Sequence, residues 1–211
     1  MRSDSQKNFL IKFKSCIRVL GPLSIFVISA LLPILHFTYS LLNYFQKPAS
    51  YGKSYLILSI IEILIVGFCI VNLDRALFIT SFKDPGRTEN QLENLTLIFS
   101  QDFINSLPVC DQCGLPKPPR AHHCSICNKC HLRMDHHCPA VGNCVALKNY
   151  QPFIVMLVWG ILSCFFFIIF LIIFAIIDSS FSRYVSIVYS VCILVILFAL
   201  CSFLFSHYYR A

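Results

Sequence analysis

Residues 110–144 read CDQCGLPKPPRAHHCSICNKCHLRMDHHCPAVGNC, and this stretch holds seven of the 12 cysteines of the chain. Most of these cysteines, together with two histidines, follow a repeat. Gaps of two, nine and six residues separate the members of one set, and the same gaps recur in a second set that begins 14 residues later. The first set is Cys110, Cys113, His123 and Cys130, and the second is Cys124, Cys127, His137 and Cys144. Three cysteines and one histidine suit a tetrahedral structural zinc ion, so the spacing predicts two of them.

The two sets interleave, because the second begins before the first ends. Each ion would hold segments that the other ion also holds, so two ions could fold the loop without a large hydrophobic core. Short hairpins and turns are the expected backbone. An all-cysteine site remains an alternative, and it would use Cys110, Cys113, Cys127 and Cys130. That set breaks the repeat and leaves both histidines without a metal, so the interleaved arrangement is favoured.

The repeat leaves Cys138 without a place in either set. The triplet His122–Cys124 recurs as His136–Cys138, but the position that corresponds to Cys127 is Val141. A thiol beside an imidazole and a bound dication has a lowered pKa, which suits a nucleophile. The sequence therefore marks Cys138 as a candidate for covalent chemistry.

Two neighbours of Cys138 could support that chemistry. His136 could take the proton of the thiol, and Asp135 could orient His136. The alternative is a thiol kept for packing, or a further ligand that competes with Cys144. We expect the other histidines outside the two sets, His122 and His131, to be ordinary polar surface.

The composition indicates a membrane protein, because 57% of the residues are hydrophobic and only 13% are charged. Crossing the hydrocarbon core takes roughly 20 apolar residues, and four stretches are long enough. They are Leu20–Leu42, Tyr55–Leu77, Phe153–Ile177 and Val185–Phe205. The expected fold is an α-helical integral membrane protein, a four-transmembrane-helix bundle with the double-zinc loop between helices 2 and 3.

The basic residues indicate the orientation of these spans. Five precede the first span and seven lie between the second and third, whereas three lie in the loops on the opposite side. The positive-inside rule then puts both termini and the cysteine-rich loop in the cytosol, where clustered cysteines bind metal more often than they form disulfides. The net charge of +7 comes from basic residues that lie mostly on one side of the predicted spans. This distribution argues against nucleic acid as a partner. The expected segments are 1–19 (cytosolic), 20–79 (helices 1 and 2), 80–107 (cytosolic linker), 108–151 (zinc domain), 152–207 (helices 3 and 4) and 208–211 (cytosolic tail).

The tetrad Asp135–Cys138, inside a cysteine-rich loop between the second and third spans, closely resembles the DHHC family of protein palmitoyltransferases. Asp84–Gly86 looks like the Asp-Pro-Gly motif of that family, and Ala121–Cys124 and Asn143–Cys144 also agree with its pattern. The resemblance implies a zinc-braced catalytic loop under four helices, with the active cysteine at the cytosolic face of an endomembrane (Golgi or ER) or of the plasma membrane.

The resemblance also implies roles for the tetrad. Cys138 would be the nucleophile, His136 the base and Asp135 the residue that orients it, while His137 would bind zinc. The expected reaction moves a long-chain acyl group, such as palmitate, from acyl-coenzyme A through Cys138 to membrane-proximal cytosolic cysteines of protein substrates. The two zinc ions would be structural.

The chain departs from the family pattern at two positions near Cys138. Family members usually have Trp where this chain has Ala140, and commonly Gly where it has Ala146. A Thr-Thr-x-Glu motif that follows the fourth span in the family is absent from the sequence. The alternative function is a catalytically inactive, membrane-anchored zinc scaffold or adaptor, in which Cys138 has no chemistry.

Overall fold

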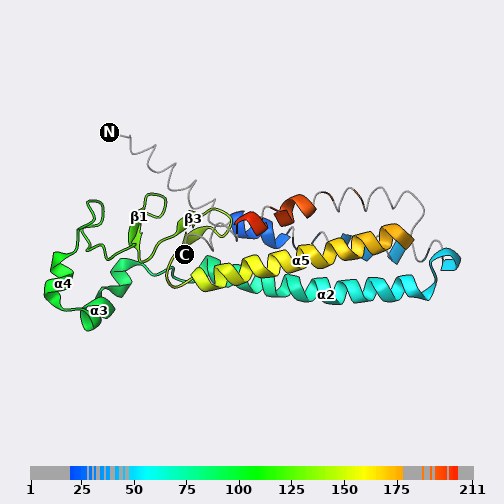
Figure 1. Cartoon of the computed structure of the whole chain (residues 1–211), viewed down its shortest axis with the longest axis horizontal. Helices are drawn as coiled ribbons and strands as arrows, with labels where there is room; N and C mark the ends of the chain where they lie inside the picture. The colour runs from blue at the N-terminus through cyan, green and yellow to red at the C-terminus, as the bar shows by residue number, and fades with distance from the viewer. Residues whose placement is uncertain are drawn as a thin grey trace. The chain divides into compact units, whose positions relative to one another are not determined.

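A computed structural model describes the chain continuously over residues 20–27 and 48–177. It also describes residues 29, 31, 34, 35, 37, 38, 41, 42, 45, 187, 191, 193–198 and 200–203. The first and fourth predicted spans lie in part outside these residues. The elements are α2 (Pro48–Phe82), α3 (Thr88–Ile98), α4 (Gln101–Ser106), β1 (His122–Cys124), β2 (Lys129–His131), β3 (His136–Cys138), β4 (Asn143–Val145) and α5 (Tyr150–Ile177) (Figure 1).

Two helices are long and apolar enough to cross a membrane, namely Tyr55–Phe82 within α2 and the whole of α5. Each of these stretches has 28 residues. At 1.5 Å per residue this gives about 42 Å, whereas the hydrocarbon core of a bilayer is about 30 Å thick. Two membrane-capable helices therefore flank the cysteine-rich region, at the places of the predicted second and third spans. The bundle of four stays a prediction.

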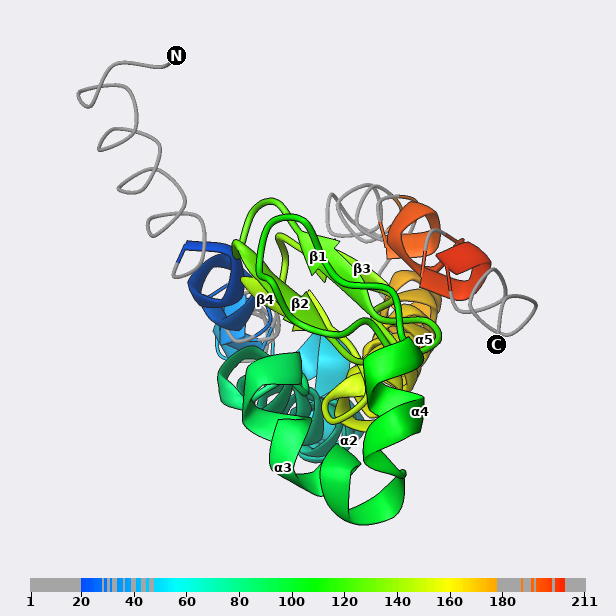
Figure 2. The ribbon, with the colours of Figure 1, turned by 90° about the vertical axis from the view of Figure 1, so that its left-hand side faces the viewer.

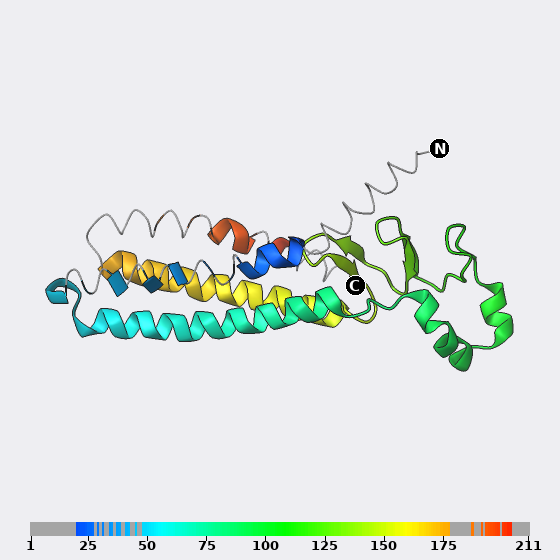
Figure 3. The same ribbon diagram turned by 180° about the vertical axis from the view of Figure 1, so that it is seen from behind.

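The chain forms two compact units, a membrane-helix unit (Phe26–Arg75 and Ile154–Ala211) and a cysteine-rich unit (Met1–Ile25 and Ala76–Phe153). In the membrane-helix unit, α2 and α5 run side by side, as Figures 1 and 3 show from opposite sides. Tyr55 contacts Phe174 with ring centroids 4.9 Å apart, and Phe68 contacts Trp159 at 5.6 Å. Early residues of α2 thus meet late residues of α5, so the two helices are antiparallel.

The cysteine-rich unit contains two short antiparallel hairpins, as the sequence predicts (Figure 2). β1 pairs with β2 so that His123 lies opposite Cys130, and β3 pairs with β4 so that His137 lies opposite Cys144. The histidine and the last cysteine of each predicted ligand set are therefore cross-strand neighbours. Directly opposed residues lie about 5 Å apart, which is close enough to share one ion.

The Asp84–Gly86 turn joins three segments of the cysteine-rich unit. The carbonyl of Pro85 accepts the N–H of Lys148 at 3.1 Å, and that of Gly86 accepts the N–H of Leu132 at 2.9 Å. Asp84 itself accepts the N–H groups of Gly86 and Arg87, and also the side chain of Asn90. Burial raises the pKa of Asp84, but these donors outweigh it, so the pKa lies below its usual range and the carboxylate is ionised at neutral pH.

Residues 92–107 form parts of two helices, although their apolar spacing suggests one short amphipathic helix. α3 ends at Ile98 and α4 begins at Gln101. The break lies at Ser100, whose extended backbone and hydroxyl cap α4 by accepting the N–H of Phe103 at 3.3 Å. A serine that satisfies a free N–H group in this way favours the start of a new helix over the continuation of the old one.

Two asparagines close the C-terminal end of α2, where the last carbonyls of a helix lack helical partners. The Asn143 amide lies 3.0 to 3.3 Å from the carbonyl oxygens of Thr80, Ser81 and Lys83. Asn149 is fully buried and donates to the carbonyls of Thr80 and Cys144. These amides tie the end of the predicted second span to the second hairpin.

We predict that Asn149→Asp destabilises the cysteine-rich unit, because a carboxylate cannot donate to the two buried carbonyls. Each buried group left unsatisfied costs about 1–3 kcal/mol, so the total for two should be roughly 2–6 kcal/mol. Thermal unfolding of the zinc-loaded chain in detergent measures the loss. Asn105→Asp, on the exposed surface of α4, is the matched control and should change the midpoint little. Equal midpoints for the two variants would contradict the capping role.

Candidate active site and metal clusters

The first ligand set comes together around the first hairpin. The sulfur atoms of Cys110, Cys113 and Cys130 lie 3.8, 3.1 and 3.8 Å from Nδ1 of His123. Cys110 and Cys130 are buried, and Cys113 and His123 are partly exposed. The Cys110–Cys113 turn precedes the hairpin, whereas His123 and Cys130 belong to its two strands. One ion at this point would fasten the turn to the hairpin.

The second set joins the two hairpins. The sulfur atoms of Cys124, Cys127 and Cys144 lie 3.8, 3.4 and 3.5 Å from Nδ1 of His137. Cys124 and Cys127 come from the first hairpin, whereas His137 and Cys144 face each other across the second. The grouping follows the interleaved order of the sequence repeat.

Both clusters fit a tetrahedral ion. In each, one ligand atom from every residue lies within 4.8 Å of all the others. Zn–S and Zn–N bonds of about 2.3 and 2.0 Å give ligand-to-ligand edges of roughly 3.5–3.8 Å, and most of the distances agree with these edges. The cysteines of both clusters are free thiols. The two clusters could therefore each hold a metal ion, and zinc suits their donors.

A third turn of the same kind follows Cys138. Gly114, Asn128 and Gly142 stand 14 residues apart, each four residues after a cysteine, and have φ of 66, 55 and 64°. This left-handed conformation favours glycine and, among other residues, asparagine. The first two turns supply paired ligands, but in the third the second cysteine is replaced by Val141, which is fully buried. Cys138 thus occupies a ligand-type position that lacks its companion.

Strand β3 separates two kinds of side chain. Alternate residues of a strand point to opposite faces, so His136 and Cys138 share one face while His137 points to the other. His137 joins the second cluster, and Cys138 lies outside both clusters. The imidazole of His136 and the thiol of Cys138 therefore lie together, next to the second cluster but not in it.

His136 lies between a carboxylate and the thiol. Its Nδ1 lies 2.6 Å from Oδ2 of Asp135, which leaves Nε2 for the sulfur of Cys138. The hydrogen bond with Cys138 and the one with Asp135 together raise the pKa of His136, although burial opposes them. The ring also packs edge-on against Phe153 with centroids 5.6 Å apart, which restricts its orientation.

Cys138 is only 8% exposed, and burial by itself would raise the pKa of its thiol. Hydrogen bonds from His136 and from the backbone N–H groups of Val141 and Ala140 outweigh burial, so the pKa of Cys138 lies below its ordinary value. The geometry thus stabilises a thiolate at residue 138 with three donors. A sulfur in this state is a strong nucleophile.

Gly21 approaches the turn that holds Cys138. A Cβ atom at Gly21 would lie 2.1 Å from the carbonyl oxygen of Pro139 and 3.2 Å from that of Ala140. Both atoms belong to the backbone of the turn and cannot move independently of it. No sequence pattern singles out Gly21, because the contact joins segments more than 100 residues apart.

His131 does not behave as predicted. It is 1% exposed, so the expectation of ordinary polar surface is wrong for this residue, whereas His122 is exposed. His131 is the last residue of β2, and an isolated bridge pairs its backbone with Arg87 next to the Asp84–Gly86 turn. The bridge thus brings the end of β2 next to this turn. A contact this distant in sequence gives no local signal.

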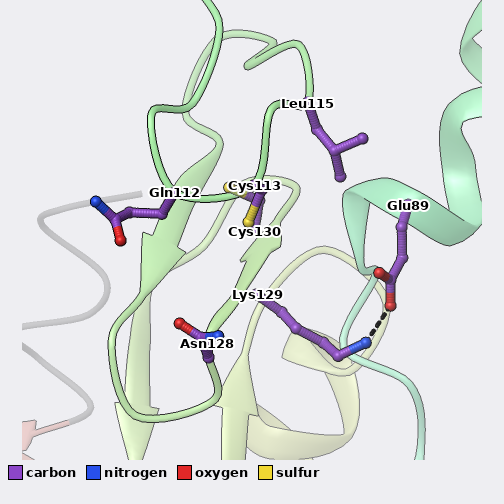
Figure 4. A pocket seen from close by; sticks show the side chains of 7 residues that line it. All are labelled: Glu89, Gln112, Cys113, Leu115, Asn128, Lys129 and Cys130. Carbon is purple, nitrogen blue, oxygen red and sulfur yellow. Dashed lines mark hydrogen bonds and ion pairs between the residues drawn. The ribbon is translucent and has the colours of Figure 1, made fainter.

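An exposed cavity of about 280 Å³ borders the first cluster, and Figure 4 shows Cys113 and Cys130 together at its centre. Glu89 from α3 and Lys129 from β2 form an ion pair across one side of it. Exposed pairs of this type contribute at most about 1 kcal/mol, so this one adds little to the stability of the fold.

The family profile described as DHHC palmitoyltransferase matches residues 104–211, about half of the chain. The chain belongs to the DHHC palmitoyltransferase family. The matched range contains both clusters and the tetrad Asp135–Cys138, the residues that the geometry brings together.

Several curated DHHC proteins are similar to the chain. Palmitoyltransferase ZDHHC2 of Mus musculus is 48% identical over 69 residues, which cover 33% of this chain and 19% of that protein. Palmitoyltransferase ZDHHC15 of Homo sapiens is 38% identical over 104 residues, with 42% and 30% covered. Probable protein S-acyltransferase 13 of Arabidopsis thaliana is 33% identical over 174 residues, with 73% and 55% covered. The chain thus spans about a fifth to a half of the length of these relatives.

We predict that Cys144→Ser lowers the zinc content of the purified chain from two ions to one or fewer. Loss of one ligand weakens a four-ligand site, and the interleaving passes the loss to the first hairpin. Metal analysis together with chelator-induced unfolding measures the effect. Cys164→Ser, in α5, is the matched control and should keep both ions. Two ions retained in Cys144→Ser would contradict the second cluster.

We predict that Gly21→Ala disturbs the Cys138 turn at a cost of about 1–3 kcal/mol, since a new methyl group must displace backbone. The rate of alkylation of Cys138 by iodoacetamide, with the modified residue located by mass spectrometry, should change several-fold. Gly67→Ala is the control, because a Cβ there meets nothing within 4 Å. If the two variants are alkylated at the same rate, Gly21 does not press on this turn.

Proposed function

We propose that the chain is a protein S-acyltransferase that moves a long-chain acyl group from acyl-coenzyme A, through an acyl-Cys138 intermediate, to cysteine thiols of protein substrates. The names of the similar proteins, palmitoyltransferase and protein S-acyltransferase, support this class of reaction. The observation that carries the proposal is the position of Cys138. It lies outside both metal clusters, and three hydrogen-bond donors surround its sulfur.

In the first step the Cys138 sulfur attacks the thioester carbonyl carbon of acyl-coenzyme A. A new carbon–sulfur bond forms, the bond to the coenzyme A sulfur breaks, and the coenzyme A thiolate leaves. His136 holds the proton that Cys138 gives up and can return it to the leaving thiolate. Asp135 is a positioning residue, because its contact with Nδ1 fixes the imidazole with Nε2 toward the sulfur.

The second step repeats this chemistry with the partners exchanged. The thiolate of a protein substrate attacks the acyl-Cys138 thioester, and Cys138 leaves with the acyl chain transferred. Both steps exchange one thioester for another, so little free energy is gained or lost in either. The protein contributes mainly by lowering the pKa of Cys138 and by holding the reacting atoms in line.

The metal ions in this proposal are two structural Zn²⁺ ions. Cys110, Cys113, His123 and Cys130 would hold one, and Cys124, Cys127, His137 and Cys144 the other. When bound, they supply the folding energy that a small hydrophobic core cannot. Because His137 would bind the second ion, that ion would also fix β3, the strand that carries His136 and Cys138.

The proposed setting is a bundle of four membrane helices with the cysteine-rich unit at the cytosolic face of an endomembrane or the plasma membrane. An acyl chain that stays in lipid avoids a cost of about 0.8 kcal/mol for each CH₂ exposed to water. Acceptor cysteines should then be cytosolic and close to the bilayer. The basic loops on one side of the spans support this orientation.

We predict that the purified chain, given palmitoyl-coenzyme A, forms a hydroxylamine-labile adduct on Cys138. Cys138→Ser should lose the adduct while keeping two zinc ions, because residue 138 belongs to neither cluster. Intact-protein mass spectrometry counts the adduct and the ions together. Cys164→Ser is the matched control and should acylate like the parent chain.

A parent chain that keeps both zinc ions but forms no adduct at residue 138 would favour the inactive zinc scaffold. Loss of zinc from Cys138→Ser would contradict the separation of this sulfur from the clusters. The same assay with acyl chains of different lengths would then define the donor preference.

A further inference from the structure

A cavity of about 330 Å³ lies at the C-terminal end of α2, between the Asp84–Gly86 turn and the first hairpin. Its lining residues all belong to the cysteine-rich unit. Asp135, His136 and Cys138 do not line it. The side chains assigned to acyl transfer therefore leave this cavity unassigned, and the chemistry of its walls indicates what it could bind.

The walls carry a surplus of positive charge. Lys83, Arg87 and Lys129 line the cavity, whereas Asp84 is its single carboxylate. Arg87 lies 3.8 Å from Asp84, and Lys129 pairs with Glu89. Among the described residues Lys83 has no ion-pair partner. Lys83 is exposed, so an anion can reach it from solvent.

Two buried polar side chains in the wall of the cavity lack hydrogen-bond partners. His131 lines the cavity, is 1% exposed, and has no hydrogen-bond partner at either ring nitrogen. The ring also faces the sulfur of Cys127, without the geometry of a full hydrogen bond. The hydroxyl of Ser81, another lining residue, is buried and has no partner either. Unsatisfied polar groups behind a positive rim favour a ligand with several hydrogen-bond acceptors.

The place of the cavity on α2 brings it to the level of lipid headgroups. Ser81 and Phe82 line it, and Phe82 ends the membrane-capable stretch that starts at Tyr55. This stretch is about 12 Å longer than the hydrocarbon core needs. Arg75, seven residues before Phe82, is the last basic residue within the stretch, and Lys83 follows directly. The end of α2 therefore extends beyond the hydrocarbon into the layer where phosphates of anionic lipids lie.

We propose that this cavity is a phosphate-binding site, separate from the catalytic cysteine, that takes the phosphorylated headgroup of an anionic lipid or a soluble phosphate ester. Lys83 and Arg87 supply the charge, and the site joins the end of α2 to the first hairpin. Occupation would hold the cysteine-rich unit at the membrane surface through α2. The proposal does not depend on acyl transfer, and its test uses no acyl donor.

The test uses the full zinc-loaded chain in non-ionic detergent. Native mass spectrometry measures the bound fraction of phosphatidylinositol 4-phosphate, with phosphatidylcholine as the lipid without net charge, and it counts the zinc ions in the same spectra. The phosphorylated lipid should bind with saturation and in preference to phosphatidylcholine. Near a membrane each basic side chain is worth about 1 kcal/mol, so Lys83→Gln should weaken binding roughly fivefold. Lys83→Gln together with Arg87→Gln should weaken it roughly thirtyfold.

The controls separate this site from general basicity and from misfolding. Arg133→Gln removes an exposed charge that does not line the cavity, so it should bind like the parent chain. Lys83→Gln changes an exposed side chain alone, and a count of two zinc ions confirms that its fold is kept. Equal binding by the parent chain and Lys83→Gln, or no preference for the phosphorylated lipid, would overturn the proposal.

A second arm distinguishes the two sources of phosphate. The deacylated headgroup, glycerophosphoinositol 4-phosphate, is added as a competitor. Competition at concentrations similar to those of the lipid assigns recognition to the phosphate group and allows a soluble ligand. Lipid binding that the headgroup does not displace assigns the site to a membrane lipid.

Discussion

The interleaving of two ligand clusters is the constraint on which the cysteine-rich unit depends. Four strands of three residues each cannot bury enough apolar surface to stay folded. The strand register brings ligands together instead, since His123 lies opposite Cys130 and His137 lies opposite Cys144. Metal binding at these pairs can supply the stability that the small core lacks. Each cluster takes its other two ligands from residues that precede its hairpin pair, and the first hairpin carries ligands of both clusters, so it cannot move without disturbing both. The positions of His136 and Cys138 follow from this bracing.

Because side chains alternate between the two faces of a β-strand, neighbouring residues of β3 can have different roles. β3 presents His137 to the second cluster and presents His136 and Cys138 to the other face. A helix would place residues two apart on nearly opposite sides and could not keep the imidazole beside the thiol. The short strand is therefore a chemical requirement, and the pairing of β3 with β4 secures it. Asn143 and Asn149 extend the same rigidity to the end of α2.

The sequence predicts those features that local patterns encode. Repeated gaps mark the eight residues of the two clusters, and apolar length marks α2 and α5, because bilayer thickness and ligand number impose fixed counts. It does not predict contacts that join distant segments. Three features depend on contacts between segments that are distant in sequence. They are the burial of His131, the approach of Gly21 to Pro139 and the asparagine caps on α2. The break between α3 and α4 has a local cause instead, the cap that Ser100 provides for α4.

The turn after Cys138 has a consequence for how reactivity can arise in a metal-binding scaffold. Gly142 repeats the left-handed backbone of Gly114 and Asn128, so the turn keeps the shape of a chelating loop. Val141 stands where the other two turns have their second cysteine, so the turn lacks one ligand atom, and a buried hydrocarbon side chain fills that position. The remaining sulfur inherits amide donors that the fold already arranges for anionic ligands. The loss of a single donor atom from a repeated ligand pattern can thus leave an uncoordinated thiol with amide donors around it, without any new architecture.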